Sequence, residues 1–240
     1  MTGVLPALAR IEARRVVRHP GVLLGVLAAF AWLPAIDAET VVAQDEIAVL
    51  GMLTFLVGFL NVDRVRRDGA DDLYAAAPSP RRVRTGAVLL SMLAAGAIAS
   101  LFALVSWLVV VGLDGEVVHE GFAVRPSPLE AAQGPFLVTA IGALGVFVGR
   151  WTARPVLAPI LMVGLLVGPV GWNIPWIVNG TAALAPGEWT LGDPAWHLVF
   201  LGGIGLVSAG LALVRDSRRR GPVALLAVGL VALIAGAALQ

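Results

Sequence analysis

The chain has 240 residues and a formal net charge of +1, and 58% of its residues are hydrophobic while only 14% are charged. Its mean hydropathy is +0.88, and soluble domains carry about 25% charged residues, so the composition excludes a soluble globular protein and indicates a polytopic membrane protein. Cysteine and lysine are both absent, which excludes disulfides, Schiff-base chemistry and a phosphate-binding loop that contains lysine.

The first segment, residues 1–19, is predicted to form an amphipathic helix at the membrane interface. Three of its basic residues share one helical face: Arg10, Arg14 and Arg18. Leu8 and Ile11 lie on the other face, and Arg15 on that side would have to extend its charged head toward water. A signal peptide is the competing interpretation, but the basic region is long and the following apolar run exceeds the usual length.

Seven apolar runs follow, at 20–36, 46–62, 85–113, 133–149, 155–172, 197–214 and 222–239. Each is long enough to cross the membrane as a helix, which takes about 20 residues, and their continuous character favours helices over a β-barrel. We therefore predict an all-α fold, a polytopic transmembrane helical bundle with six to seven spans. Residues 20–214 are expected to form a six-span domain, and residues 215–240 a basic cytoplasmic turn with an additional C-terminal span.

The distribution of arginine predicts the orientation of the chain. Four segments hold 16 of the 17 arginines: 1–19, 63–84, 150–154 and 215–221. Cytoplasmic loops carry an excess of basic residues, so these segments and the N-terminus are expected on the cytoplasmic side of the plasma (inner) membrane. Only Arg125 is then left outside, and Gln240 is expected there too.

The third outer segment, 173–196, is hydrophobic and contains Trp176, Trp189 and Trp196. An aromatic belt at the membrane interface is one interpretation. The other is a short re-entrant or surface helix that caps a pathway from outside.

Residues suited to catalysis or metal binding are sparse. The three histidines are far apart in the sequence and near span ends: His19, His119 and His197. No ionisable residue falls at the centre of a span, which argues against a proton-driven pump. Asp63, Arg150 and Arg154 lie at inner ends, where extension toward water accounts for them. No catalytic residue, metal or cofactor is expected.

Small and polar residues do occur within the spans. Four are candidates for lining a transport pathway: Thr54, Ser91, Ser100 and Ser106. Pairs of small residues at four-residue spacing permit close helix contact: Gly21/Gly25, Gly96/Ser100, Gly145/Gly149 and Gly164/Gly168. We interpret these pairs as packing within one bundle rather than as a specific dimer face.

A charged island, residues 63–84, separates the second and third apolar runs. Its middle carries the signals of a short helix, because Asp68 can cap the N-terminus and Asp71 and Asp72 fall in the first turn, where acidic side chains are favoured. A Pro-Ser-Pro sequence at 78–80 ends it. The competing interpretation is a solvated loop that arginines hold to anionic lipid.

The chain resembles the ABC-type exporter permeases of the type-two class, the membrane halves of ATP-driven exporters. The resemblance covers about residues 1–214 and rests on the basic helix before the first span and on the sequence RRDGADDLYAAAPSPRR at 66–82. The short inner turn at 150–154 and the hydrophobic outer segment at 173–196 are also similar to the family. The seventh run departs from it, because the family core has six spans and usually ends inside.

This resemblance implies that residues 68–77 form the coupling helix, which docks on a separate cytoplasmic ATPase subunit. The docking residues that it implies are Arg67, Asp68, Gly69, Asp71, Asp72, Leu73, Tyr74 and Pro78, with Arg150 and Arg154 in a second inner turn. A second permease copy or a related permease would complete a homo- or heterodimer in the lipid membrane, and no nucleic-acid partner is expected. ATP hydrolysis would occur on the partner, so the chain itself would not be an enzyme. The alternative is a non-catalytic membrane anchor or assembly protein that recruits a cytoplasmic partner through the same loop.

Overall fold

The structure is a computed structural model that describes residues 3–32, 43–67, 80–112, 117–119, 122–124, 128–152, 154, 156–171, 181–185, 188–191, 193–217 and 219–239. This described part contains eight helices and two pairs of strands. The helices are α1 (Val4–Val17), α2 (Pro20–Trp32), α3 (Ala43–Arg67), α5 (Arg81–Gly112), α6 (Pro128–Trp151), α7 (Leu157–Gly171), α8 (Pro194–Asp216) and α9 (Arg220–Leu239). The strands are β1 (Val117–His119), β2 (Phe122–Val124), β3 (Thr181–Ala185) and β4 (Glu188–Leu191).

The helical architecture predicted from the apolar runs is confirmed, because each of the seven runs falls on one helix and α1 occupies the predicted N-terminal segment. Four stretches in the described part are long and apolar enough to cross a membrane: Arg81–Leu108, Ala131–Trp151, Pro194–Asp216 and Arg220–Leu239. The helices α2 and α7 are shorter, with 13 and 15 residues. These apolar helices indicate a multi-pass membrane protein.

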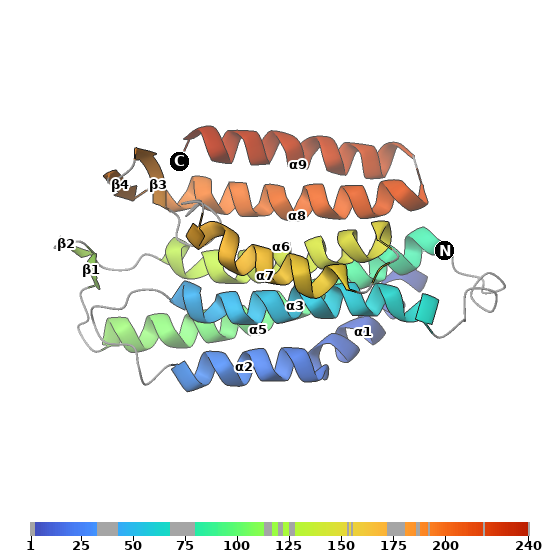
Figure 1. The fold of residues 1–240 in the computed structure, drawn as a ribbon, viewed down its shortest axis with the longest axis horizontal. Coiled ribbons are helices and arrows are strands. Elements are labelled where there is room, and N and C mark those ends of the chain that lie inside the picture. Colours follow the sequence, from blue (N-terminus) through green and yellow to red (C-terminus); the bar gives the residue numbers. More distant parts are fainter. Residues whose placement is uncertain are drawn as a thin grey trace.

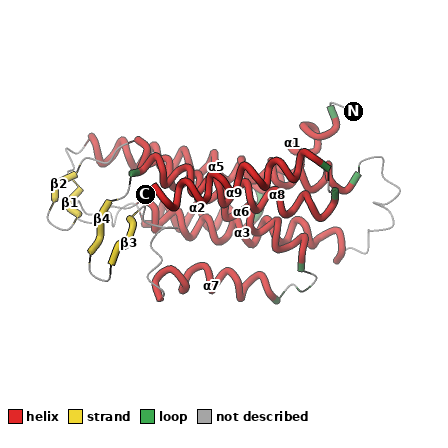
Figure 2. Tube along the Cα trace, turned by 90° about the horizontal axis from the view of Figure 1, so that it is seen from above, coloured by secondary structure: helices red, strands yellow, loops and turns green. Residues whose placement is uncertain are grey.

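The helices lie side by side along one long axis (Figure 1). The two ends of the bundle differ in their content of arginine. Toward one end lie α1, the last turns of α3, α6 and α8, and the first turns of α5, α7 and α9; the two strand pairs and the last turn of α9 lie toward the other (Figures 1 and 2). Every arginine that the structure describes belongs to α1, to those helix ends or to the turns beside them. We call this the arginine-rich end and the opposite one, which holds the strand pairs, the strand end.

Glycines bring α3 and α6, which run parallel, into main-chain contact. A Cβ built on Gly145 would overlap the carbonyl oxygen of Phe55, and one on Gly149 would come 3.0 Å from the carbonyl oxygen of Phe59. From the other side, a Cβ on Gly58 would lie 2.6 Å from a carbonyl oxygen of α6. The Gly145/Gly149 pair therefore packs within the bundle, as the sequence predicted, and the close approach gains dispersion energy along both helices.

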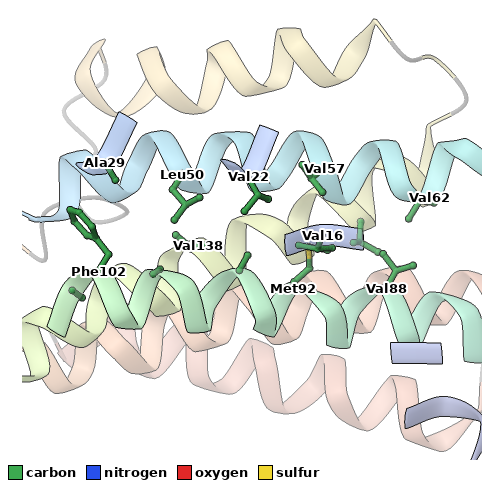
Figure 3. Close-up of a cluster of buried hydrophobic side chains, with 14 of the residues drawn as sticks. Val16, Val22, Ala29, Leu50, Val57, Val62, Val88, Met92, Phe102 and Val138 are labelled. Atoms are coloured by element: carbon green, nitrogen blue, oxygen red, sulfur yellow. The ribbon is translucent and has the colours of Figure 1, made fainter. Parts of the chain in front are cut away.

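An apolar core fills the space between α3 and α5 and extends to α1 and α2. Figure 3 shows Leu50, Val57 and Val62 of α3 in one cluster with Val22 of α2 and with Met92 and Phe102 of α5. Helix α2 joins this core, since its Phe30 ring meets Phe102 edge-on at 5.3 Å between ring centroids. This core runs along α5 and α3 and fixes the two helices relative to each other.

The seventh run forms α9, which packs antiparallel on α8 in the outermost layer of Figure 1. Glycines alternate along this contact with larger residues of the facing helix, in the pairs Phe200–Gly236, Gly203–Leu233, Val207–Gly229 and Gly210–Leu226. A Cβ on Gly203 or on Gly236 would come 2.5 Å from an amide nitrogen of the facing helix. The three- and four-residue steps of these positions match a coiled-coil seam, so we call the pair the α8–α9 hairpin.

Helix α1 packs along α5 rather than standing free. Val16 is fully buried, and a Cβ on Gly86 of α5 would lie 3.5 Å from Leu5. The arginines of the predicted polar face are exposed as expected, and Arg15 is exposed too, where its Nη1 lies 2.6 Å from Glu12 Oε1. Ile11 of the predicted apolar face is 49% exposed on the surface of the chain. The side of α1 that is buried in the bundle contains Val16.

Two of the segments that were predicted to lie outside contain strand pairs where the all-α prediction had none. Antiparallel pairing joins β1 to β2 and β3 to β4. For 181–191 this replaces the surface helix that was one interpretation of the third outer segment. Only five residues separate Gly180 from Pro186 in the sequence, which is too few for a stable helix. Helix α8 then begins at Pro194, where the Asp193 side chain accepts a 2.8 Å hydrogen bond from the Ala195 amide.

Candidate functional site

The predicted coupling segment is bracketed by two helix ends, but most of it lies outside the described residues. This applies to Asp68, Gly69, Asp71, Asp72, Leu73, Tyr74 and Pro78. Arg67 is the last residue of α3, and α5 begins at Arg81. The carbonyl oxygen of Pro80 accepts the Val83 amide at 2.9 Å, which starts α5 at the arginine-rich end. The flanks of the island therefore lie at the same end as the second predicted inner turn.

At this end, a buried carboxylate joins three helices. Asp216, the last residue of α8, forms an ion pair through Oδ1 with Nη2 of Arg150 at the end of α6. Its other oxygen, Oδ2, accepts a 2.5 Å hydrogen bond from the Thr85 hydroxyl in the first turn of α5. The Asp216 side chain is 3% exposed and that of Arg150 is 18% exposed. The carboxylate thus uses one oxygen for each of two neighbouring helices.

Trp151 adds two further contacts between α6 and α8 at the same place. Its indole Nε1 donates a 3.0 Å hydrogen bond to the carbonyl oxygen of Leu211. The guanidinium of Arg215 lies 5.6 Å from the centroid of the Trp151 ring, within the range of a cation–π contact. We call Thr85, Arg150, Trp151, Arg215 and Asp216 together the clamp.

The local sequence explains why these side chains meet. Helices α6 and α8 run in the same direction, and a Cβ on Gly205 would lie 3.5 Å from Ala140, so small residues let the two helices approach. Both helices end at the same level, α6 at Trp151 and α8 at Asp216. Basic residues are favoured in a last helical turn, whereas a carboxylate there opposes the helix dipole. Arg150 and Thr85 each contact one oxygen of Asp216 and so offset this unfavourable position.

The electrostatics of the clamp favour one fixed arrangement of its side chains. Burying an unpaired carboxylate costs several kcal/mol, roughly, and a close partner with further hydrogen bonds offsets that cost. Removal of one partner from such a pair costs about 3–5 kcal/mol. The clamp therefore favours a single arrangement of α5, α6 and α8 at the arginine-rich end.

The structure corrects the prediction that Asp63 and Arg150 extend toward water. Asp63 is 4% exposed, and the guanidinium of Arg150 turns inward to Asp216. Asp63 and Arg150 point inward because their positions face neighbouring helices. A carboxylate of opposite charge also faces Arg150. Arg154 is exposed, as predicted. The two arginines predicted to share an inner turn thus differ in environment, since Arg150 is partly buried and Arg154 is exposed.

Three of the four residues predicted to line a pathway are buried, and one is exposed. Thr54 is buried, with its hydroxyl bonded to the Leu50 carbonyl at 2.7 Å, and Ser91 is buried and bonded to the Val88 carbonyl at 2.6 Å. Ser100 is exposed on α5 and bonds to the Gly96 carbonyl at 2.9 Å. Ser106 is buried, and its hydroxyl has no hydrogen-bond partner among the described residues.

Near the arginine-rich end, His19 lies between α1 and α2. Its Nδ1 accepts a 3.1 Å hydrogen bond from the Gly21 amide. Loss of hydration on partial burial lowers the pKa of His19 from its ordinary value of 6.5. The neutral imidazole, which can accept this bond, is thereby favoured.

Sequence reasoning missed Thr85, Trp151 and Asp216. Asp216 is the single acidic residue of an arginine-rich turn, in Arg-Asp-Ser-Arg-Arg-Arg at 215–220, and that isolation is the signal that could have singled it out. Nothing in the sequence names its partners, which lie 66 and 131 residues away.

Comparisons of the chain with protein-family models, with curated proteins and with solved structures give no match.

Proposed function

We propose that the chain is the membrane-spanning permease subunit of an ATP-driven transporter of the ABC type, an exporter of the type-two class. A separate cytoplasmic ATPase would dock on loop 63–84, and a second permease, identical or related, would complete a dimer. The proposal rests on the resemblance at 66–82. It is supported by one structural observation: α3 ends and α5 begins at the arginine-rich end, beside the turn between α6 and α7.

The proposed topology assigns spans to α2, α3, α5, α6, α7 and α8, with α9 as the seventh. The arginine-rich end would face the cytoplasm and the strand end would face the outside of the plasma membrane, because basic residues favour the cytoplasmic side. This arrangement exposes both predicted docking turns to one soluble partner.

The proposed mechanism is mechanical. ATP binding would bring two partner ATPases together and displace the coupling segment, and the helices attached to it would rearrange to open a path outward. The free energy comes from the partner, and this chain supplies docking residues and packed helices that transmit the movement.

Charge reversal in the island tests this function. Asp71→Arg with Asp72→Arg is expected to abolish co-purification of an ATPase that contains a phosphate-binding loop, while membrane insertion stays normal. Asp37→Arg with Glu39→Arg, the same change of charge in a predicted outer loop, serves as the matched control and should retain the partner. Full retention of the ATPase by the Asp71 and Asp72 variant would refute the docking assignment.

Reconstitution separates this function from the alternative one. The chain reconstituted in lipid vesicles with the co-purified ATPase is expected to stimulate ATP hydrolysis. A stable complex whose hydrolysis rate equals that of the free ATPase would identify a membrane anchor instead.

A further inference from the structure

The α8–α9 hairpin has the packing of a single rigid body. Its two helices alternate glycine and larger side chains at four successive levels, and at each level the glycine leaves no room for a Cβ. A separation of α8 from α9 would lose all four contacts together. Movement of one helix of the hairpin should therefore carry the other.

Polar contacts gather where this hairpin meets the arginine-rich end. Leu211, Arg215 and Asp216, within the last six residues of α8, contact Trp151 and Arg150 of α6 and Thr85 of α5. Further toward the strand end, small residues let α8 approach α6, and a Cβ on Gly202 would lie 3.9 Å from Phe136. The clamp thus adds directional polar contacts at one end of the contact between α6 and α8.

Each partner of Asp216 stands next to one of the predicted docking turns. Thr85 is five residues beyond Pro80, where the first loop enters α5, and Arg150 is followed by Trp151, the last residue of α6, before the turn to α7. Displacement of either turn moves a group that is bonded to a different oxygen of the same carboxylate. Asp216 therefore receives movement from both turns.

We propose that Asp216 is a positioning residue that couples both inner turns to the α8–α9 hairpin, so that displacement of the turns moves this hairpin as a unit. This inference rests on the proposed function, because a docked partner must displace the turns. The physical reason is that a buried carboxylate that loses one partner is strongly destabilised. The clamp then either moves intact with the hairpin or releases as a whole, which makes it a two-state element of the kind that transmits change between sites.

Spin labels can measure this movement directly, because the chain contains no native cysteine. One label pair, Leu90→Cys on α5 and Val223→Cys on α9, joins exposed positions across the clamp. A control pair, Val199→Cys and Leu230→Cys, lies within the hairpin on exposed positions. In the complex with the co-purified ATPase, a non-hydrolysable ATP analogue should change the first distance and leave the second unchanged.

Four variants test the role of the clamp. Asp216→Asn should remove the nucleotide-dependent distance change while the ATPase still co-purifies and binds nucleotide. Arg150→Met with Asp216→Leu replaces the buried pair by apolar side chains, a change that often preserves stability, and should also lose the distance change. Thr85→Val should reduce the shifted population about tenfold, since a hydrogen bond to a charged group is involved, and Thr85→Ser should restore it.

The outcomes separate the two proposals. An unchanged nucleotide-dependent shift in the folded Arg150 and Asp216 double variant would overturn the coupling role and leave the proposed function intact. Loss of ATPase binding in the Asp216→Asn variant would also overturn it, because the clamp would then only shape the docking surface. Failure of the unmodified chain to bind any ATPase would remove the proposed function and the coupling with it.

Discussion

Gly145 of α6 lies directly against the carbonyl oxygen of Phe55 of α3, so closely that a Cβ at Gly145 would overlap it. Gly164 of α7, by contrast, has no atom within 4 Å of the corresponding position. The same residue type thus has opposite tolerance to substitution at these two places.

We expect Gly145→Leu to lower the free energy of unfolding by about 3 kcal/mol or more, because overpacking costs roughly 1–3 kcal/mol and here the obstacle is main chain. Thermal unfolding in detergent measures the effect. Gly164→Ala is the matched control and should keep or slightly raise the melting temperature, since alanine favours a helix. Equal behaviour of the two variants would contradict the α3–α6 contact.

The seam of the α8–α9 hairpin predicts a second pair of variants. Gly229→Val should detach α9, because a Cβ there would come 2.6 Å from the amide nitrogen of Val207. Hydrogen exchange of the α9 amides would then increase, relative to those of α6. Gly221→Ala, where nothing lies within 4 Å, should leave exchange unchanged. Unaltered protection of α9 in Gly229→Val would mean that the seam is not the contact described.

The buried ion pair predicts a marked asymmetry between single and double substitutions. Asp216→Asn breaks the ion pair with Arg150 and should cost about 3–5 kcal/mol of stability. The double change Arg150→Met with Asp216→Leu should be within about 1 kcal/mol of the unmodified protein or more stable. Arg219→Gln, an exposed arginine at the same end, is the control and should have no effect. Chemical denaturation distinguishes these cases, and additive costs would argue against a paired, buried carboxylate.

His19 predicts a dependence of stability on pH. Its pKa in the folded chain is below the ordinary value of 6.5, so the unfolded chain binds the proton more readily. The contribution of His19 is therefore fully present above pH 6.5 and is lost as the pH falls from there through the folded-state pKa. Melting temperatures measured from pH 8 to pH 5 should decline less for His19→Asn, whose side chain can accept the Gly21 hydrogen bond without titrating. Parallel curves for the two proteins would exclude this contribution.

The position of the C-terminal helix predicts labelling from opposite sides of the membrane. In the cysteine-free background, Leu239→Cys at the end of α9 should react with an impermeant maleimide from outside intact cells. Arg219→Cys, just before α9, should react only after the membrane is permeabilised. Labelling of Leu239→Cys solely after permeabilisation would show that α9 does not cross the membrane.

Much of the helical architecture could be predicted from sequence, since length and continuous apolarity are local properties. The seven runs fall on seven helices, and the Gly145/Gly149 spacing indicated close packing before its partner was known. The boundaries of the elements near the strand end could not be predicted in the same way. There, the strand pair at 181–191 depends on pairing between two short segments rather than on the propensity of either.

The sequence by itself determined that the chain is built of apolar helices and that its arginines gather in four segments, because composition and periodicity are written along the chain. Only the tertiary structure decided that Asp216 meets Arg150 and Thr85. The sequence accounted for Arg150 by extension toward water, yet its side chain turns inward. The physical reason is that the energy of a charge depends on what faces it, and in this fold the facing carboxylate comes from a helix 66 residues away.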